Sequence, residues 1–330
     1  MSVDWRAAQS GDAIAMEHVT KRFGDRPVLH DVSWRVPMGS IYGLIGANGA
    51  GKTTLLRLAL GVIWPASGSI TVFDTRLAHE NADLRELIHY VSSDRSLAPS
   101  LRVGEWLQFA RRLYHGWDQA RAQRLLDALE LDARQPIRVL STGQRLCVQL
   151  VVATAARPAL LLLDEPTNGL DAVVKHQFLQ LILDTAADQG TTVVWATHQL
   201  SDMERLADHV GLLYRGHFLF QGEMDGLRAR VGRIRIAIPE RSAPDLLKDP
   251  RIIEWTQRGP AALLTVQGPV DAVVHDLRAA GVTMVEALDR DLETVFRVLL
   301  RQAGYVRDGI GTAGQGEEGP RHDSLRATKA

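Results

Sequence analysis

The stretch that decides the fold is Gly46-Ala47-Asn48-Gly49-Ala50-Gly51-Lys52-Thr53-Thr54. Its spacing is that of a phosphate-binding loop, in which glycines let successive backbone N–H groups converge on phosphate oxygens. A compact apolar run at residues 40–45 precedes the loop, and a helical pattern at residues 53–60 follows it. This order puts the loop at a helix N-terminus, where partial positive charge favours the β- and γ-phosphates of a nucleotide. We expect Lys52 to bridge those phosphates and the Thr53 hydroxyl to complete the shell of a Mg²⁺ ion.

A second chemical feature is the acidic pair Asp164-Glu165, which ends the apolar run at residues 160–163. A buried parallel strand delivers its last residues to the ligand crevice of an α/β sheet. We expect Asp164 to hold Mg²⁺ through water and Glu165 to orient and deprotonate, or polarise, the water that attacks the γ-phosphate. The alternative is a solvated strand end that feeds a turn at Pro166, and the phosphate-binding loop upstream disfavours it.

The third feature is the pentapeptide Leu140-Ser141-Thr142-Gly143-Gln144. Ser-x-x-Gln is the pattern of a helix capping box, and a helix is expected from about residue 143 to residue 156. The cap leaves N–H groups of the first turn pointing outward, which makes an anion site ready for the γ-phosphate held by another subunit. Helix capping without any contact to a nucleotide stays open as the other interpretation.

In this order the three motifs resemble those of the ATP-binding cassette (ABC) ATPases, and the resemblance covers residues 13–230. The chain looks like the ATPase subunit of a bacterial ABC exporter whose membrane-spanning permease is a separate polypeptide. The resemblance implies an α/β fold of the P-loop NTPase type, in its ABC form, with an antiparallel edge sheet and a helical subdomain. It also implies hydrolysis of ATP with Mg²⁺ by a dimer, in which the pentapeptide of one subunit caps the ATP of the other. The implied cargo is a drug, an antibiotic or a lipid-like molecule. Thr142 departs from the family, which usually has glycine there.

Further residues take expected roles from their place in the family pattern. Phe23 stands where the family stacks an aromatic ring on adenine, and a core phenylalanine is the alternative. Gly169-Leu170-Asp171 matches the loop through which the two sites communicate, the alternative being a turn with a helix-capping aspartate. His198, after the strand expected at residues 191–196, matches a switch histidine that contacts the γ-phosphate. The expected catalytic residues are Glu165, His198 and Lys52, and the expected ATP-binding residues are Phe23, Gly46, Asn48, Gly49, Ala50, Gly51, Lys52, Thr53, Thr54, Ser141, Gly143, Gln144 and Asp171.

One residue that the resemblance leads us to expect is replaced. About forty residues after the loop lysine, the family has a glutamine whose amide touches Mg²⁺ and whose loop meets the permease. Ser93 falls at that position, within Tyr90-Val91-Ser92-Ser93-Asp94. A serine hydroxyl is too short to replace the amide directly. Ser93 with an extra water, Asp94 in its place, and an altered coupling to the permease therefore stay open.

The chain divides by composition into two domains and two tails. Residues 1–10 are expected to be a flexible tail and residues 306–330 a disordered one. Residues 11–229 are the ABC-type ATP-binding domain, with antiparallel edge strands at 14–19 and 28–36 and a helical subdomain at about 94–157. Residues 230–305 are expected to be a small α+β accessory domain. Its expected helices lie at residues 243–248, 270–280 and 292–303, and its expected strands at residues 234–238, 252–256, 261–266 and 282–287.

Composition limits the classes of partner. The 330-residue chain is 45% apolar, which is enough for real cores, and its formal charge of −1 gives no broad field that would steer it to nucleic acid. The single cysteine, Cys147, cannot form an internal disulfide, and the start lacks the layout of a signal peptide, so we expect a cytoplasmic protein. No run approaches the ~20 apolar residues that span a bilayer. Any membrane role must therefore come through another subunit. The partners that the resemblance implies are a second ATP-binding subunit and a permease that holds the protein at the inner face of the cell membrane.

Two other functions stay open. A soluble ABC ATPase of DNA maintenance or of the ribosome is disfavoured, because the span from Lys52 to Ser141 lacks sustained heptads and the chain has one cassette. A catalytically quiet regulatory subunit of a heterodimer is favoured by Ser93. The sequence does not specify the cargo, or whether the dimer contains two identical chains.

Overall fold

The structure is a computed structural model that describes residues 11–92, 97–237, 249–282, 285–288 and 292–304. The chain forms two compact units, one from residues up to 230 together with 290–300, and one from residues 231–289 together with those from 301 on. The tails expected at 1–10 and 306–330, the helix expected at 243–248, and Ser93 and Asp94 lie outside the described residues. Within the described ranges, the helices are all too short or too polar to cross a membrane.

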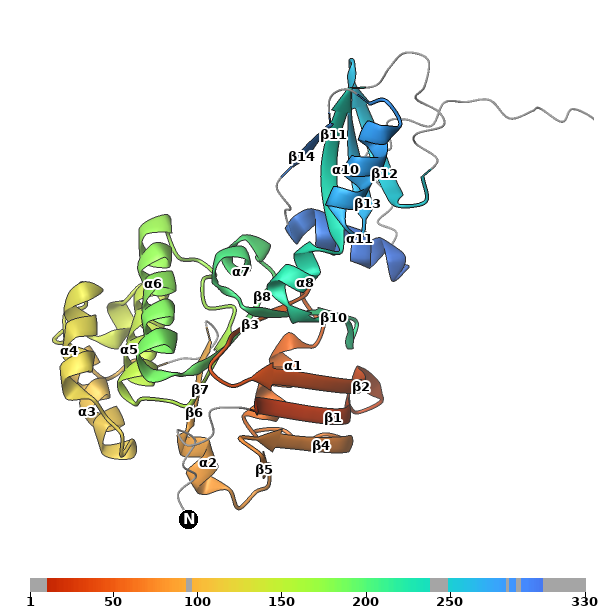
Figure 1. The fold of residues 1–330 in the computed structure, drawn as a ribbon. Helices are drawn as coiled ribbons and strands as arrows, with labels where there is room; N and C mark the ends of the chain where they lie inside the picture. The colour runs from red at the N-terminus through yellow and green to blue at the C-terminus, as the bar shows by residue number, and fades with distance from the viewer. Residues whose placement is uncertain (1–10, 93–96, 238–248, 283–284, 289–291, 305–330) are drawn as a thin grey trace, which may run out of the picture. The chain divides into compact units, whose positions relative to one another are not determined.

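An antiparallel sheet opens the first unit, with strands in the order β2-β1-β4-β5 (Figure 1). The strands are β1 (Asp12–Phe23), β2 (Arg26–Pro37), β4 (Ser67–Val72) and β5 (Thr75–Arg76). β1 and β2 pair antiparallel across the short turn at Gly24, which confirms the expected edge sheet. β4 and β5 were not predicted, because β4 is rich in Ser and Gly, which are common in turns, and β5 has only two residues.

The central sheet of the first unit has six strands in the order β10-β9-β3-β8-β7-β6. They are β3 (Ile41–Ile45), β6 (Ile88–Ser92), β7 (Leu160–Asp164), β8 (Thr192–Thr197), β9 (His209–Tyr214) and β10 (His217–Glu223). All neighbours run parallel except β9 and β10. Every residue of β3, β7 and β8 is buried, as parallel strands covered on both faces require. Because β3, β7 and β8 run parallel, the loops that follow them leave from the same carboxyl edge of the sheet.

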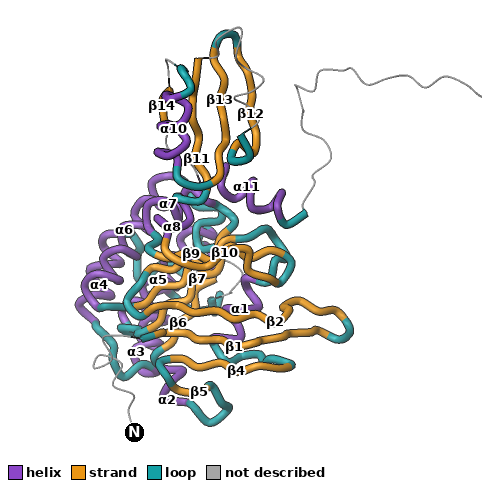
Figure 2. Tube along the Cα trace, turned by 45° about the vertical axis from the view of Figure 1, so that its right-hand side comes forward, coloured by secondary structure: helices purple, strands orange, loops and turns teal. Residues whose placement is uncertain are grey.

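Helices of the first unit fall into two groups. Those next to the central sheet are α1 (Lys52–Ala59), α2 (Ala82–Glu86), α6 (Ala172–Gln189), α7 (Leu200–Leu206) and α8 (Met224–Arg228). The expected helical subdomain contains α3 (Val103–Leu113), α4 (Gln119–Ala128), the short 3₁₀ helix η1 (Ile137–Val139) and α5 (Thr142–Ala155). Figures 1 and 2 show α3, α4 and α5 gathered on one side of the unit beside α6. They share an apolar core that includes Val103, Leu126 and Val151, so this subdomain holds its helices through contacts of its own.

Among its described residues, the second unit is a four-stranded antiparallel sheet in the order β12-β13-β11-β14, with helix α10 against it. Its elements are β11 (Val231–Ala237), β12 (Ile252–Arg258), β13 (Ala261–Gln267), α10 (Val270–Ala279) and β14 (Val285–Leu288). Alternate residues of β11 and β13, such as Ile234 and Leu264, pack with Val273 of α10. This is the α+β arrangement that the sequence pattern predicts.

The boundary near the C-terminus differs from the expectation. We expected the last helix to belong to the accessory domain, but residues 290–300, which hold most of α11 (Leu292–Gln302), belong to the first unit. One apolar face of α11 is buried through residues such as Val295 and Val298. Its first N–H, at Leu292, donates to Glu204 Oε1 at 2.6 Å. The chain thus returns to the first unit, and an amphipathic pattern alone does not tell which core a helix joins.

Candidate functional site

The loop at residues 46–51 joins β3 to α1 at the carboxyl edge of the central sheet. Gly51 adopts φ of 112°, a conformation that a side chain would strain. A Cβ added at Gly46 would lie 2.4 Å from the Leu213 carbonyl oxygen of β9, so only glycine fits between the two strands. Asn48 and Gly49 are exposed, and Thr53 and Thr54 are half-buried on the first turn of α1. The sequence folds here into the strand, loop and helix that a phosphate site requires.

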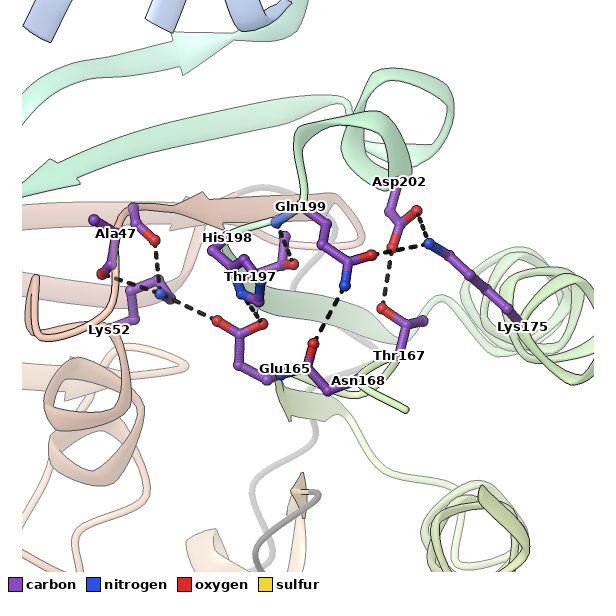
Figure 3. Close-up of polar contacts among 11 residues, drawn as sticks. Ala47, Lys52, Glu165, Thr167, Asn168, Lys175, Thr197, His198, Gln199 and Asp202 are labelled. Carbon is purple, nitrogen blue, oxygen red and sulfur yellow. Dashed lines mark hydrogen bonds and ion pairs between the residues drawn. The ribbon is translucent and has the colours of Figure 1, made fainter. Parts of the chain in front are cut away.

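The side chain of Lys52 is buried inside this loop. Its ammonium donates to Gly46 O at 2.7 Å and to Ala47 O at 3.3 Å. It also lies 3.2 Å from Glu165 Oε1, and the lysine side chain is only 6% exposed. Figure 3 shows these contacts converging on the ammonium. A buried positive charge is thus balanced by one carboxylate and two carbonyl dipoles, all at the mouth of the phosphate loop.

Glu165 and His198 meet across the ends of neighbouring strands. Glu165 Oε2 lies 2.8 Å from His198 Nδ1, which is within reach of a hydrogen bond or an ion pair. The backbone of Glu165 has φ of 49°, in the left-handed region that a glutamate rarely adopts. Its N–H donates to Ala196 O at 2.9 Å, which ties the turn after β7 to β8. His198 is 41% exposed while Glu165 is 18% exposed, so the pair faces an accessible edge of the sheet.

Asp164 is buried beside this pair at the end of β7. Its Oδ2 accepts the Tyr90 hydroxyl at 2.8 Å, and Tyr90 lies on the neighbouring strand β6. Its Oδ1 is buried and has no hydrogen-bond partner among the described residues. Burial, and then the neighbouring carboxylate of Asp164, raise the pKa of Tyr90 to about 12, so this hydroxyl stays a donor at neutral pH. Sequence reasoning missed this contact because Tyr90 and Asp164 are far apart in the chain.

The pentapeptide forms the capping box that its pattern predicts. Ser141 Oγ accepts from Gln144 N at 3.1 Å, and Gln144 Oε1 accepts from Ser141 N at 2.9 Å. Arg145 adds a bond of 2.8 Å to Leu140 O. Ser141 is exposed, and a Cβ added at Gly143 would lie 2.9 Å from the side chain of Leu170. The pentapeptide is therefore held by hydrogen bonds among its own residues, while its serine remains exposed to solvent.

The other expected residues occupy two further places. Asp171 caps α6, since its Oδ1 accepts from Val173 N at 2.9 Å and from Val174 N at 3.0 Å, and this cap is compatible with either interpretation of the loop. Phe23 ends β1 and is 50% exposed, so the core alternative for this ring is wrong. The Lys21 ammonium lies 5.0 Å from the centre of the Phe23 ring. Across the described residues, no hydrogen bond or ion pair joins Phe23, Ser141 or Asp171 to the phosphate loop.

A group of polar residues behind Glu165 and His198 was not predicted. These side chains come from the turn after β7, from α6 and from the start of α7, and they bond one another: Thr167, Asn168, Lys175, Gln199 and Asp202. A buried acid on a short amphipathic helix was the available signal, because Asp202 has apolar neighbours in sequence at Leu200, Met203 and Leu206. Its partners could not be found in the same way, since they lie about thirty residues earlier.

Comparison with known proteins gives consistent matches for this part of the chain. Residues 29–168 match the ABC transporter family, a range that holds both the phosphate loop and Asp164-Glu165. The ABC transporter ATP-binding protein YtrB of Bacillus subtilis (strain 168) is 34% identical over 224 residues, which are 68% of this chain and 76% of that protein. The Nod factor export ATP-binding protein I of Bradyrhizobium sp. (strain SNU001) is 35% identical over 224 residues, or 66% of this chain and 72% of that protein. A solved structure of the ATP binding subunit of an ABC transporter aligns with a TM-score of 0.60 at 28% identity, covering 66% of this chain and 92% of that one.

Proposed function

Since the chain belongs to the ABC transporter family, as an ATP-binding subunit that hydrolyses ATP to drive transport, we propose that it powers an exporter with a separate permease. ATPases of this family dimerise and pair with permease subunits. Export is supported by the relative named for Nod factor export. The permease would hold the protein at the cytoplasmic face of the cell membrane and would select the cargo.

The observation that carries the catalytic part of the proposal is the convergence of Lys52, Glu165 and His198 at one edge of the sheet. The Glu165 carboxylate already contacts Lys52 at 3.2 Å and His198 at 2.8 Å. Lys52 would leave the loop carbonyls and neutralise the β- and γ-phosphates. Glu165 would then be free to orient and polarise a water for in-line attack, with His198 holding its carboxylate and contacting the γ-phosphate. Positioning and charge neutralisation supply most of the catalysis in phosphoryl transfer.

Mg²⁺ fits the residues at the end of β7. Asp164 Oδ1 is buried and lacks a hydrogen-bond partner in the described part of the chain, a state that costs free energy unless a cation or its waters face the oxygen. Mg²⁺ prefers carboxylate and hydroxyl oxygens and keeps several of its waters. Asp164, through water, and the Thr53 hydroxyl would hold it, with Ser93 or Asp94 as further predicted ligands. When bound, the ion would neutralise charge on the phosphate oxygens.

We propose further that each ATP site is shared between two chains. Ser141, Gly143 and Gln144 lie at the N-terminus of a 14-residue helix, where Ser141 is exposed and the other two are half-buried. Helix dipole and free N–H groups there would receive the γ-phosphate of ATP held by another subunit. Asp171 lies at the end of the turn that starts at Glu165. Through this turn, ATP binding or hydrolysis at one site would affect the other site.

The adenine would stack on Phe23. Its ring is half exposed and has the Lys21 ammonium 5.0 Å from its centre, with that ammonium anchored at 2.6 Å on Trp64 O. A ring held in this way offers a face to a purine without first having to become ordered. Phe23 would therefore contribute to affinity for ATP and leave the chemical step to the groups on the sheet edge.

Replacing Glu165 with Gln tests the assignment. Glu165→Gln should lower kcat for ATP hydrolysis by about 10³-fold, as expected for loss of a general base. ATP with Mg²⁺ should still raise the melting temperature of the variant, because binding to the folded state stabilises it. The matched control is Glu86→Gln, an exposed acid 3.2 Å from His115, which should hydrolyse ATP like the wild type. Full-rate hydrolysis by Glu165→Gln would overturn the assignment, and hydrolysis by the wild-type protein alone would exclude the quiet regulatory subunit.

A further inference from the structure

A buried ion pair lies behind the catalytic edge of the sheet. The ammonium of Lys175, on α6, is 2.6 Å from Asp202 Oδ1, on α7. The side chain of Asp202 is 4% exposed and that of Lys175 is 26% exposed. A carboxylate this deeply buried requires close partners, because removal from water is expensive for a charge. Figure 3 shows the pair on the side of Glu165 that faces away from Lys52.

Each member of the ion pair also bonds a loop of the site. Thr167 Oγ1, two residues after Glu165, donates to Asp202 Oδ2 at 3.0 Å. Lys175 Nζ donates to Gln199 Oε1 at 3.0 Å, and Gln199 is the residue after His198. The pair therefore bonds the turn that follows Glu165 and, at the same time, the turn that contains His198.

The two turns also bond each other directly. Gln199 Nε2 donates to Asn168 Oδ1 at 3.2 Å, and Glu165 Oε2 lies 2.8 Å from His198 Nδ1. Gln199 N donates to Thr197 Oγ1 at 2.9 Å, which keeps the second turn tight. Hydrogen bonds thus join the two turns to each other, and we call them the linked turns.

The linked turns hold Glu165 in a strained backbone conformation. Glu165 has φ of 49°, which a non-glycine residue keeps only where its surroundings fix it. A general base must also lie within hydrogen-bond reach of the attacking water, and a shift of about 1 Å can cost roughly 100-fold in rate. The contacts that fix Glu165 therefore matter for the rate even when they touch neither ATP nor water.

We propose that Lys175 and Asp202 are positioning residues for hydrolysis, which lock the turn carrying Glu165 to the turn carrying His198 so that both groups meet one γ-phosphate. The described side-chain contacts of the pair go to Thr167, Gln199 and each other, so it acts through these turns. The inference rests on the proposed ATPase function. It predicts that loss of the ion pair lowers kcat for hydrolysis while ATP binding stays nearly unchanged.

The main test is Lys175→Met, which keeps an apolar stem and removes the charge. The expected kcat falls about 30- to 100-fold, while KM for ATP changes less than about threefold, because positioning of the base is lost and nucleotide contacts stay. Lys175→Arg restores a cation and should recover most of the loss. A purely structural role would lower the melting temperature without this split between kcat and KM.

A second readout does not depend on activity. In hydrogen–deuterium exchange, peptides covering residues 165–171 and 197–200 should both exchange faster in Lys175→Met than in the wild type. The matched control is Arg121→Met, which also removes a buried cation, one that donates to Thr185 Oγ1 at 2.9 Å and lies 3.8 Å from Asp188. It should lose stability but leave kcat and both peptides unchanged.

A milder variant provides the test if Lys175→Met does not fold. Thr167→Val keeps the volume and the ion pair, and removes the one hydroxyl that ties the first turn to Asp202. It should lower kcat about three- to tenfold, the effect of one lost hydrogen bond. Wild-type kcat in Lys175→Met and Thr167→Val overturns the inference. A wild-type protein that does not hydrolyse ATP overturns the proposed function instead, and the exchange experiment then decides the inference by itself.

Discussion

The two halves of the expected ATP site are held in different ways. On the sheet edge, Lys52 and His198 come from distant parts of the chain, and each contacts the largely buried Glu165. At the start of α5, Ser141 and Gln144 are three residues apart and close a capping box on each other. The first half is assembled by tertiary contacts and the second by local ones. The groups of the first half therefore meet within one chain, whereas we propose that the second half acts on the ATP of another subunit.

The two halves should accordingly fail in different ways. Removing the Lys52 ammonium from the sheet edge leaves the Glu165 carboxylate without its buried counter-charge, so ATP binding, hydrolysis and stability should change together. Removing a group from the capped segment costs a helix cap and an anion contact, and leaves nucleotide binding by the single chain intact. The predictions below use this distinction.

Lys52→Met should have the largest effect. The variant removes the charge that would face the phosphates and leaves Glu165 with His198 as its remaining ionic neighbour. Hydrolysis should fall by at least about 10³-fold, and the rise in melting temperature on adding ATP should disappear. Both are measured with the purified protein by phosphate release and by thermal unfolding. A variant that still gains stability from ATP would show that the phosphate loop holds nucleotide without its lysine, and would break the comparison.

Ser141→Arg should come next. The large side chain would fill the anion site, so hydrolysis should fall about 100-fold, while ATP should still stabilise the single chain. The control for cap loss is Asp118→Ala, because Asp118 Oδ1 accepts from Arg121 N at 2.8 Å and caps α4. That variant should lose about 1 kcal/mol of stability and keep its turnover.

Mixing the two inactive variants sharpens the same comparison. If each site takes its two halves from different chains, a mixed dimer of Lys52→Met and Ser141→Arg has one site with both defects and one site with neither. The mixture should then regain hydrolysis that neither variant has alone. If both halves of a site came from one chain, mixing would restore nothing.

Phe23→Ala should have an intermediate effect that is confined to binding. Stacking of a base on an aromatic ring is worth ~1–3 kcal/mol, so KM for ATP should rise about tenfold with little change in kcat. The control is Phe109→Ala, which removes another half-exposed ring, one that lies on α3. A fall in kcat without a rise in KM would place Phe23 outside the adenine site.

The same contrast explains what the sequence could predict. The phosphate loop, the Asp164-Glu165 pair and the capping box are contiguous, so their chemistry and their place on strand, loop or helix can be read from neighbouring residues. The contacts of Lys175 with Asp202 and of Tyr90 with Asp164 join residues 27 and 74 positions apart, as set by the parallel order of the strands. No local pattern encodes such a pair. The assignment of residues 290–300 to the first unit has the same cause, because an apolar helix face fits more than one core.

The smallest effect is expected for Tyr90→Phe, which tests a contact of the sheet-edge half that only the fold revealed. The Tyr90 hydroxyl holds Asp164 Oδ2 at 2.8 Å and leaves Oδ1 for the cation. Loss of this one hydrogen bond should lower kcat, or raise the Mg²⁺ concentration needed for half-maximal rate, about two- to fivefold. The raised pKa of Tyr90, about 12, means that its hydroxyl is protonated throughout pH 6 to 9, so the shape of the pH–rate profile should not change in that window.

Tyr114→Phe is the matched control and should keep both parameters. Tyr114 follows α3 in the helical subdomain, and its ring lies tilted against His89 of β6 with 4.5 Å between the ring centres. A Tyr90→Phe variant with an altered pH profile would mean that this hydroxyl takes part in proton transfer during turnover, beyond holding Asp164 in place. An unchanged profile with a weaker Mg²⁺ response would instead place Asp164 with the metal and leave proton transfer to Glu165, which is the division of labour that its contact with His198 favours.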